Sequence, residues 1–322
     1  MGEVKSPFGR PVLFVNPSYL LKTFVIQRLL ELEFEVYYVD SIRSVKSILQ
    51  KLPHALCLID VDSAMAAEEY LNFIASIERT AEYEDVMIGV LTRRAASLQK
   101  SYNEQLVLKL GFINTSVNKE TLLQDLTVLF NAYEIKGRRQ FVRVSLTNES
   151  GAQFYCKIQG LPTHFPLRDI SSCGFACEAK GYPEAAFTQN ALIPGELQLG
   201  TTILPCSVVL FAIKSAGPSL MLVMLFAQTN AWSNKKTIRE FVASTLQKKI
   251  DEIRATGTID DADYSKMDES LPPKPKTEAD EAAETDEKPA DTPTESEQPA
   301  ADGEQKADEP QTDSGQAAAA ES

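Results

Sequence analysis

The chain has 322 residues, more than one hydrophobic core usually serves, so two domains of ordinary size are expected. Its net charge of −13 is concentrated at one end, because residues 260–322 hold 20 acidic residues against 5 lysines and leave 25 acidic and 27 basic residues elsewhere. This nearly neutral remainder argues against a nucleic-acid-binding protein. The longest wholly apolar run, eight residues from Leu220 to Ala227, is far below the ~18–20 that span a bilayer.

Short apolar runs alternate with helical patterns five times between Pro11 and Tyr133. This alternation predicts an α/β domain over residues 8–134, with a doubly wound, five-stranded parallel sheet. We expect strands at 12–15, 35–39, 55–59, 86–91 and 112–116, and helices at 19–32, 42–51, 66–79, 95–108 and 121–133.

A different rhythm follows a basic junction at Glu134–Arg139. Strand-like segments separated by turn signals, with no helical pattern between them, predict a six-stranded antiparallel β-barrel in a second domain, residues 135–256. We place its strands at 141–146, 153–159, 175–178, 195–199, 203–214 and 220–227. A closing helix, which Asn234 could cap, carries an apolar stripe that includes Ile238, Val242, Leu246 and Ile250.

The C-terminal segment has no Val, Ile, Leu, Met or aromatic residue after Leu271, so it cannot bury enough apolar surface to offset its chain entropy. We predict a disordered acidic tail over residues 260–322. The N-terminus lacks the apolar core of a signal peptide, and the five cysteines are an odd number without metal-ligand spacing. Reduced thiols, no metal, no membrane insertion and a cytoplasmic location are therefore expected.

Two short motifs stand out in the second half. The first is Arg139-x-x-x-Arg143, at the start of the first barrel strand, and the second is Asp169-x-Ser171-x-x-Gly174, interpreted as a turn that leads into another strand. Alone, the first would fit a solvated basic junction and the second a simple Asx turn. Together, in this order and spacing and in a β-rich context, they resemble the PilZ family.

The resemblance implies that the ligand is cyclic di-GMP, bound by Arg139, Arg143, Asp169, Ser171 and Gly174. A guanidinium can bridge guanine O6 and N7, bind phosphate and stack on a purine, whereas a carboxylate suits the guanine donor edge. Ser171 could offer its hydroxyl, and Gly174 permits close backbone approach or positive φ. Arg138 and Arg168, each just before a motif, are secondary candidates, and Arg138 is expected to influence how many nucleotides bind.

The first half resembles the receiver domain of response regulators, but as a degenerate, pseudo-receiver form. Asp60 follows the third strand, where that family has its phosphate acceptor, and Thr92 follows the fourth. The acidic pair expected after the first strand is missing, because that strand ends in Val15-Asn16-Pro17, and Lys119 is displaced from the usual lysine position. A Mg²⁺ site is therefore incomplete, and Asp60 and Asp62 could instead cap the next helix.

These features predict a non-enzymatic cyclic di-GMP sensor or adaptor that needs no cofactor. Ligand binding is expected to order Glu134–Arg143, to change conformation and so to regulate an unknown downstream protein, in motility or virulence as the family implies. One alternative is a response-regulator-like protein; another is an adaptor that acts through protein contacts without binding nucleotide. No nucleophile with an adjacent base supports an enzyme.

Overall fold

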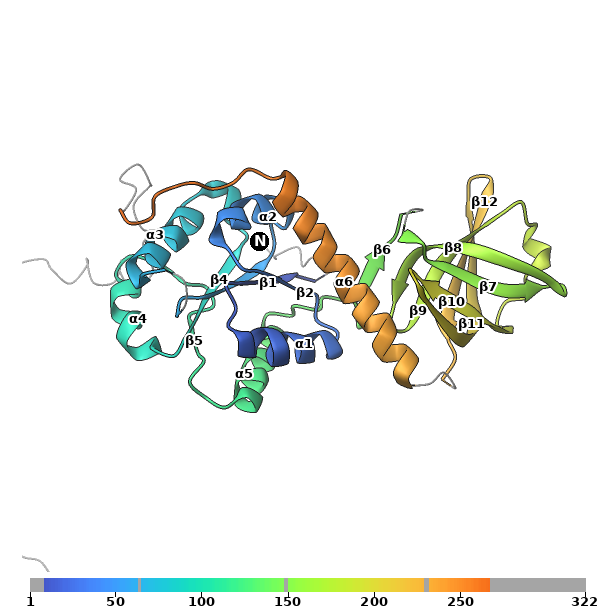
Figure 1. Ribbon diagram of the computed structural model, residues 1–322, viewed down its shortest axis with the longest axis horizontal. Helices are drawn as coiled ribbons and strands as arrows, with labels where there is room; N and C mark the ends of the chain where they lie inside the picture. Colours follow the sequence, from blue (N-terminus) through green and yellow to red (C-terminus); the bar gives the residue numbers. More distant parts are fainter. Residues whose placement is uncertain (1–8, 63–64, 148–149, 229–231, 267–322) are drawn as a thin grey trace, which may run out of the picture. The chain divides into compact units, whose positions relative to one another are not determined.

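The computed structural model describes residues 9–62, 65–147, 150–228 and 232–266, and all of these lie in one compact unit. They form a parallel sheet, an antiparallel sheet and a long last helix (Figure 1). The predicted fold class is confirmed. A domain boundary at 134/135 stays a prediction, and most of the predicted tail lies outside the described residues.

The parallel sheet has the strand order β2-β1-β3-β4-β5. Its inner strands read as continuous apolar runs because helices bury both of their faces; every residue of β1 and β3 is buried. All five predicted strands occur: β1 (Val12–Val15), β2 (Val36–Val39), β3 (Leu56–Asp60), β4 (Met87–Thr92) and β5 (Phe112–Asn114).

Helices cover the two faces of this sheet. On one face α1 (Gln27–Glu31) and α5 (Lys119–Ala132) pack against the core, and on the other lie α2 (Val45–Lys51), α3 (Ala67–Glu78) and α4 (Ala95–Asn103); Figure 1 shows α1 and α5 opposite α2 and α3. The predicted helix 19–32 is π-helical in η1 (Leu21–Ile26) before it becomes α1. Short 3₁₀ turns are η2 (Ile42–Ser44) and η3 (Ala81–Tyr83). The α4 helix ends five residues before its predicted end at Leu108.

The antiparallel sheet closes into a barrel of six strands, because β8 pairs with both β7 and β9, and β6 adds to its edge. The barrel strands are β7 (Gln153–Ile158), β8 (Leu161–Ser171), β9 (Gly174–Lys180), β10 (Leu192–Leu199), β11 (Thr202–Ala216) and β12 (Ser219–Phe226); the added strand is β6 (Arg143–Ser145), and a 3₁₀ turn, η5 (Glu184–Ala186), follows β9. The predicted number of barrel strands is therefore correct, although their membership differs. Strand β8 was not predicted, and the segment at 141–146 supplies only the short added strand.

The last helix, α6 (Trp232–Thr256), contacts β2 and α2 as well as β6 and β8. Its predicted apolar stripe is buried. Asn234 lies inside the first turn rather than at the cap, and its amide donates to the carbonyl of Pro205 (2.7 Å). Beyond the helix, Tyr264 is buried and packs edge-on against Phe73, so the chain is still held to the fold at Tyr264, where the sequence predicted the beginning of the tail.

Candidate functional site

The two predicted motifs meet across the pairing of β6 with β8. Arg143 is opposite Ser171 in this register, and Ser145 is opposite Asp169. The guanidinium of Arg143 lies 3.5 Å from the carboxylate of Asp169, and the two side chains remain 43% and 24% exposed. One cation and one acceptor are therefore presented together at the protein surface.

A β-bulge in β8 places a second arginine beside Asp169. From the pair Leu167–Cys177 to the pair Asp169–Ala176, the chain moves two residues along β8 but only one along β9, so β8 contains one extra residue. Arg168 and Asp169 consequently share the outer side of the strand, where a regular strand would point them apart. The guanidinium of Arg168 is hydrogen-bonded to Glu178, and this bond lowers the pKa of Glu178 below its ordinary value.

These side chains line a surface hollow of about 180 Å³, which we call the Arg143 hollow. Its walls combine three cations, one carboxylate and an apolar floor from β9 and β12. No sequence motif marks Lys214, because its position depends on the pairing of β11 with β12. The lining residues are Arg143, Arg168, Asp169, Cys173, Gly174, Phe175, Ala176, Lys214, Met221, Val223, Met224 and Leu225.

Ser171 and Gly174 shape the hairpin between β8 and β9. Ser171 is buried, and its hydroxyl donates to the carbonyl of Gly174 (3.1 Å), so it does not line the hollow. A Cβ on Gly174 would overlap the carbonyl oxygen of Met224. The glycine thus permits close approach of β12, and it is absent from the residues with positive φ. The second motif is therefore not a turn along its whole length: Asp169 and Ser171 belong to the end of β8, Gly174 begins β9, and a tight turn joins the two strands.

The segment before β6 carries Arg138 and Arg139, both exposed. Arg139 and Arg143 line a second hollow of about 50 Å³, the Arg139 hollow, which also contains the carboxylates of Glu33 and Glu35. Arg143 therefore borders both hollows, and the Arg139 hollow brings the two predicted arginines together. Arg138 lines neither of them.

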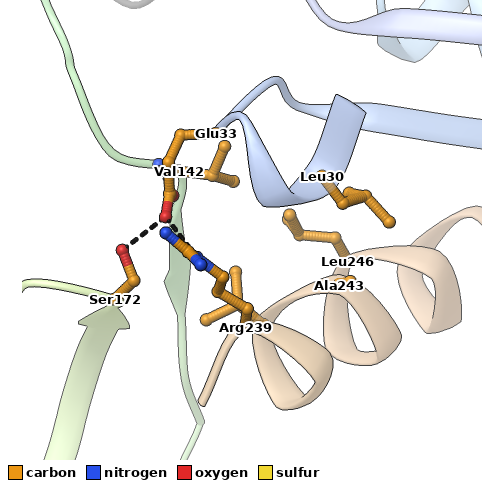
Figure 2. Close-up of a pocket in the computed structure, with 8 residues that line it drawn as sticks. Leu30, Glu33, Val142, Ser172, Arg239, Ala243 and Leu246 are labelled. Carbon is orange, nitrogen blue, oxygen red and sulfur yellow. Dashed lines mark hydrogen bonds and ion pairs between the residues drawn. The ribbon is translucent and has the colours of Figure 1, made fainter. Parts of the chain in front are cut away.

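Glu33, which no sequence motif marks, joins both motifs to α6. Its carboxylate accepts hydrogen bonds from the hydroxyl of Ser172 (2.6 Å), the backbone N–H of Val142 (3.2 Å) and the guanidinium of Arg239 (2.7 Å). Figure 2 shows Ser172 and Arg239 directed toward it.

The carboxyl edge of the parallel sheet has a different chemistry. Asp60 is buried, and its two carboxylate oxygens accept the backbone N–H groups of Ser18 and Asp62, each at 3.1 Å. Burial raises the pKa of Asp60 although these hydrogen bonds oppose the shift. Lys119 lies over the ring of Phe24, 4.5 Å from its centroid.

Asp62 connects β3 to the loop after β4. It accepts hydrogen bonds from the hydroxyl of Thr92 (2.7 Å) and the backbone N–H of Arg93 (2.7 Å), and lies 3.5 Å from the guanidinium of Arg94. Burial would raise the pKa of Asp62, but the hydrogen bonds from Arg93 and Thr92 outweigh it and lower the pKa. The suggestion that Asp60 and Asp62 cap the next helix is wrong, because α3 begins at Ala67 without a side-chain cap.

Metal-binding groups do not gather in the described part of the chain: it contains no cluster of three or more His, Cys, Asp or Glu side chains suited to a metal ion. Among the same residues, no helix is long and apolar enough to cross a bilayer.

Solved structures of two kinds are similar to this chain. One is the PilZ domain of YcgR from Escherichia coli with c-di-GMP, with a TM-score of 0.33 and 14% identity over 37% of this chain and 98% of that one. Another is the MrkH–c-di-GMP complex of K. pneumonia, with a TM-score of 0.33 and 16% identity over 36% of this chain and 55% of that one. The third is the chemotaxis protein CheY4 of Vibrio cholerae, with a TM-score of 0.32 and 22% identity over 38% of this chain and 98% of that one.

This chain thus spans nearly all of the isolated PilZ domain and of CheY4, but about half the length of MrkH. No protein-family model matches the sequence, and no curated protein does.

Proposed function

We propose that this protein is a cytoplasmic, non-enzymatic sensor that binds cyclic di-GMP in the Arg143 hollow. The observation that carries the proposal is the composition of this hollow. Arg143 and Asp169 stand 3.5 Å apart beside Arg168 and Lys214, above an apolar floor that includes Val223. A ligand with anionic, flat apolar and hydrogen-bonding parts would use every one of these features.

Cyclic di-GMP has these parts. Arg143 can bridge O6 and N7 of guanine or bind a phosphodiester through two parallel N–H donors. Asp169 can accept from the N1 and N2 donors of guanine, and apolar side chains can support a base face. The preceding segment would bring Arg139 and Arg138 to the same ligand. Binding would then order Glu134–Arg143, change the conformation of the protein and regulate a downstream protein in motility or virulence.

Titration calorimetry on the full chain tests this proposal. Cyclic di-GMP should bind saturably, and cyclic di-AMP at least about tenfold more weakly, because adenine has a donor where guanine has O6. No saturable binding, or equal affinity for the two, would favour the adaptor alternative.

We further infer that the receiver-like half works without phosphorylation of Asp60, through protein contacts. Three observations support this: an asparagine at position 16, engagement of both Asp60 oxygens by backbone N–H groups, and the contact of Lys119 with the ring of Phe24. Beryllofluoride with micromolar Mg²⁺ should therefore leave the amide resonances around Asp60 unchanged. Saturable shifts there would show that the acceptor site is functional.

A further inference from the structure

Glu33 occupies a backbone conformation that normally selects glycine. It follows α1 with a φ of 62°, in the left-handed region that is unfavourable for a residue with a side chain. Glycine would adopt this conformation without the steric strain that the glutamate side chain causes. This cost directs attention to what the side chain does.

The Glu33 carboxylate contacts a residue inside each nucleotide motif. Val142, whose N–H it accepts, lies between Arg139 and Arg143; Ser172, whose hydroxyl it accepts, lies between Ser171 and Gly174. One oxygen receives Val142, and the other receives both Ser172 and Arg239. A single side chain from the first half of the chain therefore links the two motifs, in addition to the pairing of β6 with β8.

The surroundings strengthen these contacts. The side chains of Glu33 and Arg239 are only 9% and 18% exposed. Leu30 and Leu246 line the same small cavity as the ion pair (Figure 2). Charge-assisted hydrogen bonds are stronger where water is excluded, and the loss of an acceptor there leaves buried donors unsatisfied.

We propose that Glu33 is a positioning residue of the cyclic di-GMP site. It holds the segment before β6 against the β8–β9 hairpin, so that Arg143 and Asp169 are already adjacent when the ligand arrives. Without it, the ligand would have to order this segment itself, at a cost in affinity. The inference rests on the proposed function.

Linkage adds a second consequence. If the Glu33 contacts favour ligand binding, bound ligand must favour those contacts to the same extent. Occupancy of the site would therefore slow exchange of the Val142 amide hydrogen, and would tighten the contact of Glu33 with Arg239 of α6.

The test uses Glu33→Met combined with Arg239→Met, which removes acid and base together and leaves no uncompensated buried charge. Its matched control is Glu31→Met with Arg28→Met. These two side chains form an exposed ion pair on α1, with 2.6 Å between the guanidinium and the carboxylate, and they belong to neither motif. We expect the first pair of substitutions to weaken cyclic di-GMP binding about tenfold or more and the control pair to leave affinity unchanged. Arg239→Met alone should keep most of the affinity, because Glu33 still accepts from Val142 and Ser172.

Hydrogen exchange separates this inference from the proposed function. In the ligand-free protein the Val142 amide should exchange slowly, and in the Glu33→Met/Arg239→Met variant about tenfold faster or more. Wild-type affinity in that variant, or equal Val142 exchange in the two proteins, would overturn the positioning role. Absence of binding to the wild-type protein would refute the proposed function, and Val142 exchange would still decide the role of Glu33. If the double variant unfolds, Ser172→Ala takes its place in the test, because it removes one of the three donors to Glu33. A severalfold loss of cyclic di-GMP affinity is then expected, and wild-type affinity would contradict the positioning role.

Discussion

Cys173 differs from the other four cysteines in that it is partly exposed and lines the Arg143 hollow, whereas they are buried. Burial raises the pKa of Cys156 and of Cys206 to about 11, and that of Cys57 to about 12. Thiolates are the reactive form. A thiol reagent at neutral pH should therefore modify Cys173 first in the folded protein.

Cyclic di-GMP should slow this modification, because a ligand in the hollow covers Cys173. Mass spectrometry after timed labelling, with and without saturating nucleotide, measures the effect, and Cys173→Ser should abolish the fast phase. Equal labelling rates with and without bound nucleotide would place the ligand elsewhere.

The residues of the candidate site were only partly predictable. Arg143, Asp169 and Gly174 line one hollow because β8 pairs with β6 on one side and with β9 on the other, which brings residues of both motifs side by side. The inward hydroxyl of Ser171 was missed because a motif does not reveal on which side of a strand a residue faces. Lys214 and Glu33 approach from distant elements, and single-sequence periodicity contains no information on such contacts.

At the scale of elements, the parallel sheet followed from the sequence because its buried strands and amphipathic helices alternate clearly. Strand β8 did not, since Pro162 and Pro166 interrupt its pattern, and proline within a run normally argues against a strand. The bulge at Arg168 also shifts the alternation, so that buried Leu167 and Ile170 are three residues apart.

The loop after β3 makes a pH-dependent contribution to stability. The folded-state pKa of Asp62 lies below its ordinary value of 3.8, so its carboxylate stabilises the fold fully above that value, and this contribution is lost as pH falls through the lower folded pKa. Asp62→Ala should cost about 1–3 kcal/mol at pH 7, from hydrogen bonds to a charged group. The cost should shrink as the pH falls below 3.8.

Urea denaturation of wild type and Asp62→Ala at neutral and acidic pH measures this difference. Asp125→Ala, at an exposed position of α5, is the control and should change stability little at either pH. A loss for Asp62→Ala that is independent of pH would contradict the assigned role of the carboxylate.

At the scale of the whole molecule, the net charge of −13 opposes an anionic ligand, although residues 1–259 contribute +2. Screening limits such long-range repulsion to about 8 Å at physiological ionic strength. Affinity must therefore come from the local arrangement of Arg143, Arg168 and Lys214 around the hollow. Binding should weaken with added salt as these contacts are screened.

The most direct test of the account is calorimetric titration of cyclic di-GMP into wild type, Arg143→Ala and Arg28→Ala. Arg28 is an exposed arginine of α1 paired with Glu31, away from both hollows. Removing Arg143 should cost about 1.5–3 kcal/mol, at least a tenfold loss of affinity, while Arg28→Ala should bind like wild type. Equal affinity of Arg143→Ala and wild type would contradict the assignment of the Arg143 hollow as the nucleotide site.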